Sequence, residues 1–198
     1  MPKKQLIIPV VVLILALSLS AFGLYQLNKI PAPKFPEIST KFSLMSDHGR
    51  VSSDEMKGKV GLIFFGYTHC PDVCPTTMLT VSSTLNKLSD AERTKVRSYF
   101  ISIDPERDSP KQASEFAHHF SPDLIGLSGS TEEVTAAAEA FKVGYEKDKP
   151  NKKGNYDIAH STYIFLVRPD GELGDLIGHA DSPDDIAEKV RYWLKWAD

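Results

Sequence analysis

Residues 60–77 read VGLIFFGYTHCPDVCPTT, and this stretch determines the fold class that we expect. Residues 60–65 form an unbroken apolar run, which is typical of a strand that is buried on both faces of a sheet. Residues 75–88 then carry apolar side chains at helical spacing. The stretch therefore predicts a buried strand that leads into a helix, and the two cysteines of the chain, Cys70 and Cys74, lie where the helix begins.

The sequence after this stretch continues to alternate between strands and helices. Ser109-Pro110 predicts a helix start, and Ser130 with Glu133 three residues later is typical of a capping box. The expected strands are 96–103, 124–127, 162–167 and 172–177, and the expected helices begin near 75, 110, 131 and 183. The last two strands flank the turn sequence Arg168-Pro-Asp-Gly171 and form a predicted hairpin. This order predicts an α/β sheet covered on both faces, with the element order of a thioredoxin-like fold.

The N-terminal part of the chain has the features of a membrane anchor. Residues 5–27 are uncharged, and about 20 apolar residues suffice for a helix to cross a bilayer. Two lysines precede this run, so the positive-inside rule places the N-terminus in the cytoplasm and the rest of the chain on the far side. We expect a cytoplasmic N-terminus and one transmembrane helix at 1–27, a Pro-rich linker at 28–40 and a single domain at 41–198.

The expected compartment follows from what the N-terminal segment contains. It has no Arg- and Ser-rich transit sequence and no cysteine for a lipid anchor, which favours the inner membrane of a bacterium with the domain in the periplasm. Ala21-Phe22-Gly23 leaves cleavage of the segment as an alternative. Beyond residue 27 the chain carries 26 acidic residues and all but two of its 23 basic residues, with no basic stripe, which argues against nucleic acid as a partner.

Cys70 and Cys74 lie four positions apart at a predicted helix N-terminus. The helix dipole and the unpaired amide groups there lower the pKa of a thiol, and the thiolate is both a nucleophile and a metal ligand. One interpretation is a structural disulfide, although so short a loop restricts the unfolded chain little. A second is a redox-active disulfide, although the typical motif has two intervening residues. A third is a site for a soft metal ion such as Cu(I), with zinc as the rival.

A third metal ligand would be a histidine from another part of the chain. His160 lies just before the predicted strand 162–167. In a thioredoxin-like arrangement the residue ahead of that strand faces the cysteine turn, so we expect His160 to complete the site. The other histidines are expected to point away, to lie on the surface or to sit in turns, and they are His48, His69, His118, His119 and His179. Met78 continues the face of the two cysteines but is interpreted as a core residue.

Three ordered motifs resemble those of the Sco/SenC family of cytochrome c oxidase assembly proteins. They are the run Gly66-Tyr-Thr-His-Cys-Pro-Asp-Val-Cys-Pro-Thr-Thr77, the run Asp104-Pro-Glu-Arg-Asp-Ser-Pro110, and His160-Ser followed by a strand and Pro-Asp-Gly171. The resemblance covers the predicted domain and implies that Cys70, Cys74 and His160 bind copper, as Cu(I) or Cu(II). It also implies delivery of copper to, or maturation of, the binuclear copper site of cytochrome c oxidase subunit II.

The second motif contains charged residues whose roles the sequence leaves open. Asp104 matches the family's aspartate, and the resemblance implies that it orients His160 or tunes the site from behind the ligands. The alternative is that the segment is only a turn in which Ser109-Pro110 caps the next helix. Arg107 and Asp108 are interpreted as parts of that turn.

The residues and the resemblance together favour a copper chaperone over an enzyme. Two thiolates and one imidazole in a shallow site would pass copper to incoming cysteines by ligand exchange. The expected partners are oxidase subunit II, other periplasmic copper carriers or thiol reductants, and the membrane through the N-terminal helix. The alternative is a thiol-disulfide oxidoreductase in which Cys70 and Cys74 form the redox-active disulfide and keep the oxidase cysteines reduced.

Overall fold

The computed structural model describes Leu13, residues 15–20, Phe22, and residues 38–152, 154–178 and 180–197. The chain divides into two compact units, Met1–Pro33 and Lys34–Asp198. The described residues of the first unit are helical. No helix among the described residues is both long and apolar enough to cross a membrane. Most of the predicted transmembrane segment and of the predicted linker lies outside the described residues, so both stay predictions.

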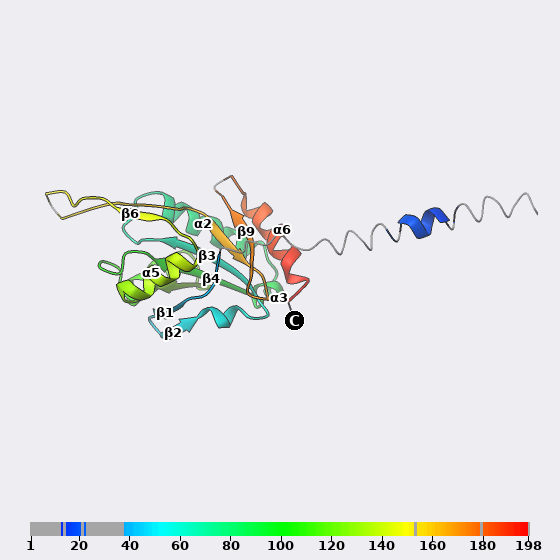
Figure 1. Ribbon diagram of the computed structural model, residues 1–198, viewed down its shortest axis with the longest axis horizontal. Coiled ribbons are helices and arrows are strands. Elements are labelled where there is room, and N and C mark those ends of the chain that lie inside the picture. The colour runs from blue at the N-terminus through cyan, green and yellow to red at the C-terminus, as the bar shows by residue number, and fades with distance from the viewer. Residues whose placement is uncertain are drawn as a thin grey trace, which may run out of the picture. The chain divides into compact units, whose positions relative to one another are not determined.

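The second unit is built on a five-stranded sheet with the strand order β5-β4-β3-β8-β9 (Figure 1). β3, β4 and β5 run parallel, and β8 and β9 extend the sheet through antiparallel pairs. The bounds of these strands are Val60–Gly66 for β3, Val96–Ser102 for β4, Leu124–Leu127 for β5, Ile164–Val167 for β8 and Leu173–Ile177 for β9. Every residue of the central strand β3 is buried, which confirms the prediction from its unbroken apolar run.

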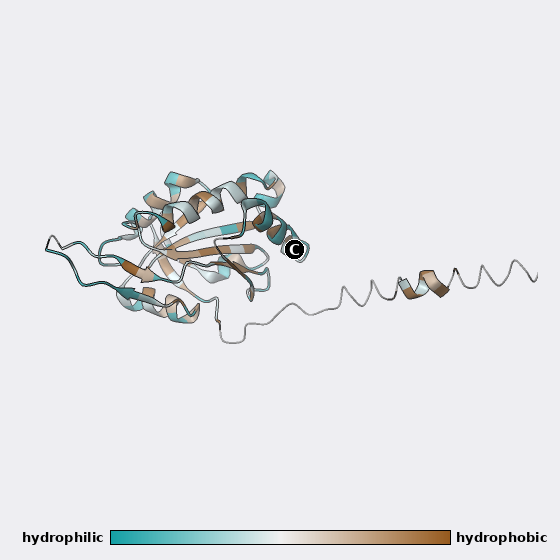
Figure 2. Cartoon of the chain, turned by 90° about the horizontal axis from the view of Figure 1, so that it is seen from above, coloured by the Kyte–Doolittle hydropathy of each residue, from teal (hydrophilic) through white to brown (hydrophobic). Residues whose placement is uncertain are grey.

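One face of the sheet is covered by α2 (Val73–Asn86), α4 (Pro110–Phe120) and α6 (Pro183–Leu194). α2 contacts both of the other helices. Phe100 of β4 packs on Phe116 of α4 with ring centroids 4.7 Å apart. Figure 2 shows the hydrophobic positions gathered in the strands and the hydrophilic ones on the outer sides of the helices, as expected for a sheet between two covering layers.

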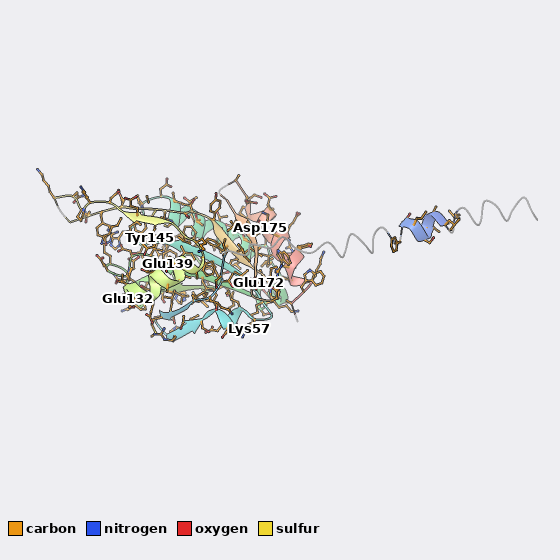
Figure 3. The ribbon with its side chains drawn as sticks, viewed as in Figure 1. Lys57, Glu132, Glu139, Tyr145, Glu172 and Asp175 are labelled. Carbon is orange, nitrogen blue, oxygen red and sulfur yellow. The ribbon has the colours of Figure 1, made fainter. Side chains whose placement is uncertain are left out.

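The opposite face carries α5 (Thr131–Ala140), and Phe141 at its end packs on Phe65 and Phe165 with ring centroids 5.1 and 5.2 Å apart. Glu132 and Glu139 of α5 are exposed on the outer side of the helix (Figure 3). The coverage of both faces confirms the predicted thioredoxin-like arrangement. The N-terminal hairpin and the 3-10 helix after it were not predicted, and they are β1 (Ser43–Ser46), β2 (Gly49–Ser52) and η1 (Ser53–Met56).

Four of the α-helices begin with a capping box, in which a serine side chain and a side chain three residues later satisfy the free amide groups. The serines are Ser89 before α3 (Asp90–Arg93), Ser109 before α4, Ser130 before α5 and Ser182 before α6. The predicted starts of α4 and α5 are thereby confirmed. α2 differs, because its N-cap Asp72 makes no side-chain cap bond and the helix begins two residues before the predicted start.

A second small sheet lies outside the main one and pairs β6 (Tyr145–Lys147) with β7 (Ile158–His160). The loop between them extends away from the rest of the domain in Figure 1, where it is drawn in yellow. These strands were not predicted, because three residues are too few to show an alternating pattern. They place His160 at the end of a strand and not in a loop.

The strand directions bring three distant segments to one edge of the main sheet. β3 and β4 are parallel, so the chain leaves both strands at the same edge. β8 is antiparallel to β3, so the chain enters β8 at that edge as well. The cysteine turn, the second motif and His160 therefore meet there.

Candidate metal centre

The cysteine turn lies between the end of β3 and the start of α2. Cys70 and Cys74 are free thiols. Cys74 is fully buried in the first turn of α2, whereas Cys70 is partly exposed. Gly66 at the end of β3 makes room for the buried sulfur, since a Cβ atom there would lie 2.7 Å from Sγ of Cys74. The glycine therefore allows Cys74 to pack directly against the central strand.

Cys70 lies three residues before the first residue of α2, two residues before the N-cap Asp72. The backbone amide groups of Asp72, Val73 and Cys74 favour the thiolate form of its sulfur. Partial burial disfavours the thiolate of Cys70, but these amide groups and the Cys74 thiol outweigh that effect and lower its pKa. The uncapped start of α2 is therefore the anion-stabilising element that the sequence predicted at the cysteines.

Cys74 has the opposite character. Burial raises its pKa far above the usual range, despite a hydrogen bond to the backbone of Tyr67, and the charges of Cys70 and Asp108 raise it further. Without a cation nearby, Cys74 therefore stays a thiol, and Cys70 is the cysteine that loses its proton more readily. A bound metal ion would supply the positive charge that removes the proton from Cys74.

The ring of His160 faces the cysteines, and its Nε2 lies 3.7 Å from Sγ of Cys74. Its Nδ1 lies 2.9 Å from the carbonyl oxygen of Ser161, which can only accept a hydrogen bond. Burial lowers the pKa of His160, so the ring is neutral, with its proton on Nδ1 and a free lone pair on Nε2. That is the tautomer that a metal ligand requires.

Nε2 of His160 thus lies beside Sγ of Cys74, and the thiol of Cys74 also interacts with that of Cys70. The ligand atoms of the three residues do not all lie within 4.8 Å of one another, so the structure brings His160 to Cys74 and not to both cysteines. Thiolate and imidazole are the ligands that soft ions such as Cu(I) prefer. Structural zinc sites take four ligands, so a set of three favours copper. The donor set therefore fits the metal that the sequence predicted.

Asp104 is buried in the loop after β4, and its carboxylate contacts Tyr156 and Arg107. Oη of Tyr156 donates to Oδ1 at 2.7 Å, and Nε of Arg107 donates to Oδ2. Nδ1 of His160 meets the carbonyl of Ser161 and not Asp104, so orientation of His160 by Asp104, or tuning of the site, would have to act through other residues. Arg107 and Tyr156 connect the carboxylate of Asp104 to the segment ahead of His160.

Asp108 is a residue that the sequence interpretation missed. It is fully buried and anchors the cysteine turn: its carboxylate accepts hydrogen bonds from the amide of Thr68 at 2.8 Å and from Oγ of Ser102 at 2.6 Å. Oγ1 of Thr68 donates to the same carboxylate at 2.5 Å. The sequence could have indicated this role, because Thr68 follows β3 and Asp108 follows β4. Segments that follow neighbouring parallel strands meet at one edge of the sheet.

A nitrogen and two carboxylates also lie together beside the site, on His69, Asp104 and Asp108, with ligand atoms within 4.8 Å of one another. Both carboxylates already accept hydrogen bonds from protein donors, so we interpret this group as a hydrogen-bond network that stabilises the loops and not as a metal site. The remaining predictions are consistent with the structure where it describes the residue. His48 and His69 are exposed, Met78 is fully buried, and His179 lies outside the described residues.

The SCO1/SenC family model matches residues 31–195 of the chain. The chain belongs to the SCO1/SenC family. The match includes all three motifs, which confirms the resemblance drawn from them.

Three relatives illustrate the range of this similarity. Protein sco1 of Schizosaccharomyces pombe is 34% identical over 163 residues, which are 80% of this chain and 62% of that protein. The structure of Bradyrhizobium japonicum ScoI with copper bound is 37% identical, with a TM-score of 0.73 over 79% of this chain and 99% of that one. BsSco, a Sco family member with a disulfide switch, is 28% identical, with a TM-score of 0.63 over 83% and 98%. The chain spans only 46% to 62% of the full length of three curated relatives, from Schizosaccharomyces pombe, Arabidopsis thaliana and Saccharomyces cerevisiae.

Proposed function

We propose that this SCO1/SenC protein is a copper chaperone that holds the ion on Sγ of Cys70, Sγ of Cys74 and Nε2 of His160. The main support for the proposal is that Nε2 of His160 lies 3.7 Å from Sγ of Cys74, although the two residues are 86 positions apart in the sequence. The proton of the ring is on Nδ1, so the lone pair of Nε2 is free to bind the ion. Copper is the cargo of the protein. Asp108 anchors the cysteine turn at Thr68, and Gly66 leaves room for Sγ of Cys74.

The proposed acceptor is the binuclear copper site of cytochrome c oxidase subunit II. Two findings about relatives support it: ScoI of Bradyrhizobium japonicum has been solved with copper bound, and BsSco belongs to the Sco family of cytochrome c oxidase assembly proteins. Other copper carriers or thiol reductants are proposed as the donors of copper and of electrons. The chain acts as a carrier and not as an enzyme.

The exposure of the three ligands suggests the order of ligand exchange. Cys70 is the partly exposed sulfur with the lowered pKa, so an incoming cysteine of the acceptor meets copper on its side. The incoming thiolate adds to copper, one resident sulfur leaves, and that sulfur takes up the proton that the incoming thiol lost. Cys74 regains its proton most readily, because burial raises its pKa. Return of that proton favours release of the ion.

The proposed location is the inner membrane of a bacterium, with a single span in residues 5–27 and the domain in the periplasm. The uncharged run behind Lys3 and Lys4 supports this orientation. The linker at 28–40 would hold the metal site away from the lipid surface, as expected for a Pro-rich segment.

A thiol-disulfide oxidoreductase is the second candidate, and the asymmetry of the cysteines favours it. A partly exposed thiolate, Cys70, followed by a buried thiol, Cys74, is the arrangement of an attacking and a resolving cysteine. In this function Cys70 attacks a disulfide of the target and forms a mixed disulfide. Cys74 then displaces the target thiol and leaves the Cys70–Cys74 disulfide.

Copper analysis of the reduced full chain tests the first proposal. We expect close to one copper per chain, a severe loss in Cys70→Ala and His160→Ala, and no loss in the control His118→Ala, which changes a histidine at the end of α4. Equal copper retention by His160→Ala would remove His160 from the site. Rapid disulfide reduction that does not depend on His160, together with no retained copper, would favour the oxidoreductase.

A further inference from the structure

The backbone of His160 lies in a small sheet outside the main one, and its ring meets the ring of Phe64 of β3 edge-on at 6.0 Å between centroids. β7, which ends at His160, pairs with β6 in a two-stranded sheet of three residues per strand. An isolated two-stranded sheet is marginally stable at best. The position of Nε2 therefore depends on what fixes the segment that enters β7.

Arg107 fixes this segment from the loop after β4. Its Nη1 donates to the carbonyl oxygen of Tyr156 at 3.0 Å, and its Cζ lies 3.5 Å from the centroid of the Tyr156 ring. Its Nε donates to the buried Asp104, whose other oxygen accepts the hydroxyl of Tyr156. Tyr156 is thus held at its carbonyl, its ring and its hydroxyl by one charged pair.

Tyr67 connects this pair to the imidazole. Its ring centroid lies 5.7 Å from Cζ of Arg107. Its hydroxyl oxygen accepts the amide of Ile158 at 3.3 Å, and its ring meets the ring of His160 edge-on at 6.0 Å between centroids. The backbone ahead of His160 and the imidazole itself are therefore both positioned against residues that Arg107 contacts.

We propose that Arg107 is a positioning residue for copper: by holding Tyr156 and Tyr67, it keeps Nε2 of His160 in place beside Cys74. This inference rests on the proposed copper site. Arg107 reaches the histidine ligand through its contacts with Tyr156 and Tyr67, and these contacts include neither thiol. Loss of Arg107 should weaken copper binding only to the extent that His160 contributes to it.

A double-mutant cycle of Arg107→Gln and His160→Ala on the reduced full chain tests this dependence, with Cu(I) affinity measured by competition with a chromophoric chelator. Loss of a residue that orients a metal ligand typically costs 10- to 100-fold in affinity, so we expect a loss of about 10-fold from Arg107→Gln in the wild-type background. In the His160→Ala background the same substitution should cost less than about twofold, because the ligand that it positions is gone.

A matched control and a spectroscopic readout separate positioning from a general loss of stability. Arg168→Gln is the control, because Arg168 is about as buried as Arg107 and also pairs with an aspartate, Asp170. Arg168 lies near the ring of Trp193, at the end of β8 opposite to the metal site. This variant should leave copper affinity unchanged. In the Cu(II)-loaded chain, Arg107→Gln should diminish the nitrogen hyperfine splitting in the electron paramagnetic resonance spectrum, whereas Arg168→Gln should retain it.

Arg107→Lys serves as the second variant if Arg107→Gln does not fold. It keeps the charge but loses the fork that reaches both Asp104 and Tyr156, so the same loss and the same dependence on His160 are expected. Equal losses in both backgrounds, or no loss at all, would overturn the inference while leaving the copper site in place. A wild-type chain that retains no copper would instead overturn the proposed function, and the inference with it.

Discussion

Cys70 and Cys74 are separated by three residues, yet they have different chemistry. Backbone amide groups at the uncapped start of α2 lower the pKa of Cys70, whereas burial against β3 raises the pKa of Cys74. The sequence predicted a lowered pKa for the pair as a whole from its helix N-terminus. It could not predict the asymmetry, because that depends on which sulfur packs beneath Gly66.

The asymmetry predicts that the two thiols react with alkylating reagents at different pH. The thiolate is the reactive form, so a lowered pKa gives Cys70 a larger reactive fraction than a free cysteine at any pH below its usual pKa, and a raised pKa gives Cys74 a smaller one. Brief treatment of the reduced, copper-free chain with iodoacetamide near pH 7 should modify Cys70 first, as measured by peptide mass spectrometry. Preferential modification of Cys74 would contradict this assignment.

Gly66 offers a second test at the residue scale. A methyl group there would lie 2.7 Å from Sγ of Cys74 and 2.8 Å from the ring of Phe64, so one of these side chains must move. We expect Gly66→Ala to lower the free energy of unfolding by about 1–3 kcal/mol, as overpacking of a core typically does, and to weaken copper binding. Urea unfolding measures the first effect.

Gly144→Ala is the matched control for Gly66→Ala. The nearest atom to a Cβ at Gly144 is Oγ of Ser161 at 3.9 Å, which is ordinary contact. This variant should unfold close to the wild-type urea concentration. Wild-type stability and copper affinity in Gly66→Ala would show that Cys74 does not need the space.

At the scale of elements, β6 and β7 differ from the strands of the main sheet. β3 is paired on both sides and every residue in it is buried, whereas all three residues of β6 are exposed. Elements with few buried contacts open locally at a lower free-energy cost than the core. His160, the proposed third ligand, is thus carried by a less stable element than the cysteines, which lie at the end of β3 and the start of α2.

Hydrogen exchange measures this difference directly. The backbone amides of residues 145–160 should exchange well before those of β3 and β4 in the reduced, copper-free chain. Addition of Cu(I) should slow exchange in 158–160, because the ion ties His160 to two residues at the start of α2. If the amides of 145–160 exchanged as slowly as those of β3, β7 would not open separately from the core. If copper did not slow exchange in β7, His160 would not be a ligand of the ion. Either result would contradict the account.

At the scale of the whole molecule, the sheet assembles the site from segments that are far apart in sequence. The parallel β3 and β4 and the antiparallel β8 bring the cysteine turn, the second motif and His160 to one edge. This much followed from the sequence, because the unbroken apolar run, the serine caps and the final hairpin indicated the element order. The position of His160 ahead of β8 then placed it near the cysteines.

What the sequence did not predict are contacts made through polar side chains. From the sequence, Arg107 and Asp108 are interpreted as parts of a turn, because they lie in a segment with prolines just before a helix cap. In the structure Asp108 is fully buried and Arg107 lies between two tyrosine rings. Neither set of partners follows from the local pattern, because the tyrosine partners of Arg107 and the Thr68 partner of Asp108 come from distant segments of the chain.

The most direct test of the account is the X-ray absorption spectrum at the copper edge of the reduced full chain loaded with one equivalent of Cu(I). The account predicts two sulfur ligands and one nitrogen ligand in the wild type, and loss of the nitrogen with both sulfurs retained in His160→Ala. A wild-type spectrum with sulfur ligands alone, or a nitrogen ligand that persists in His160→Ala, would contradict it.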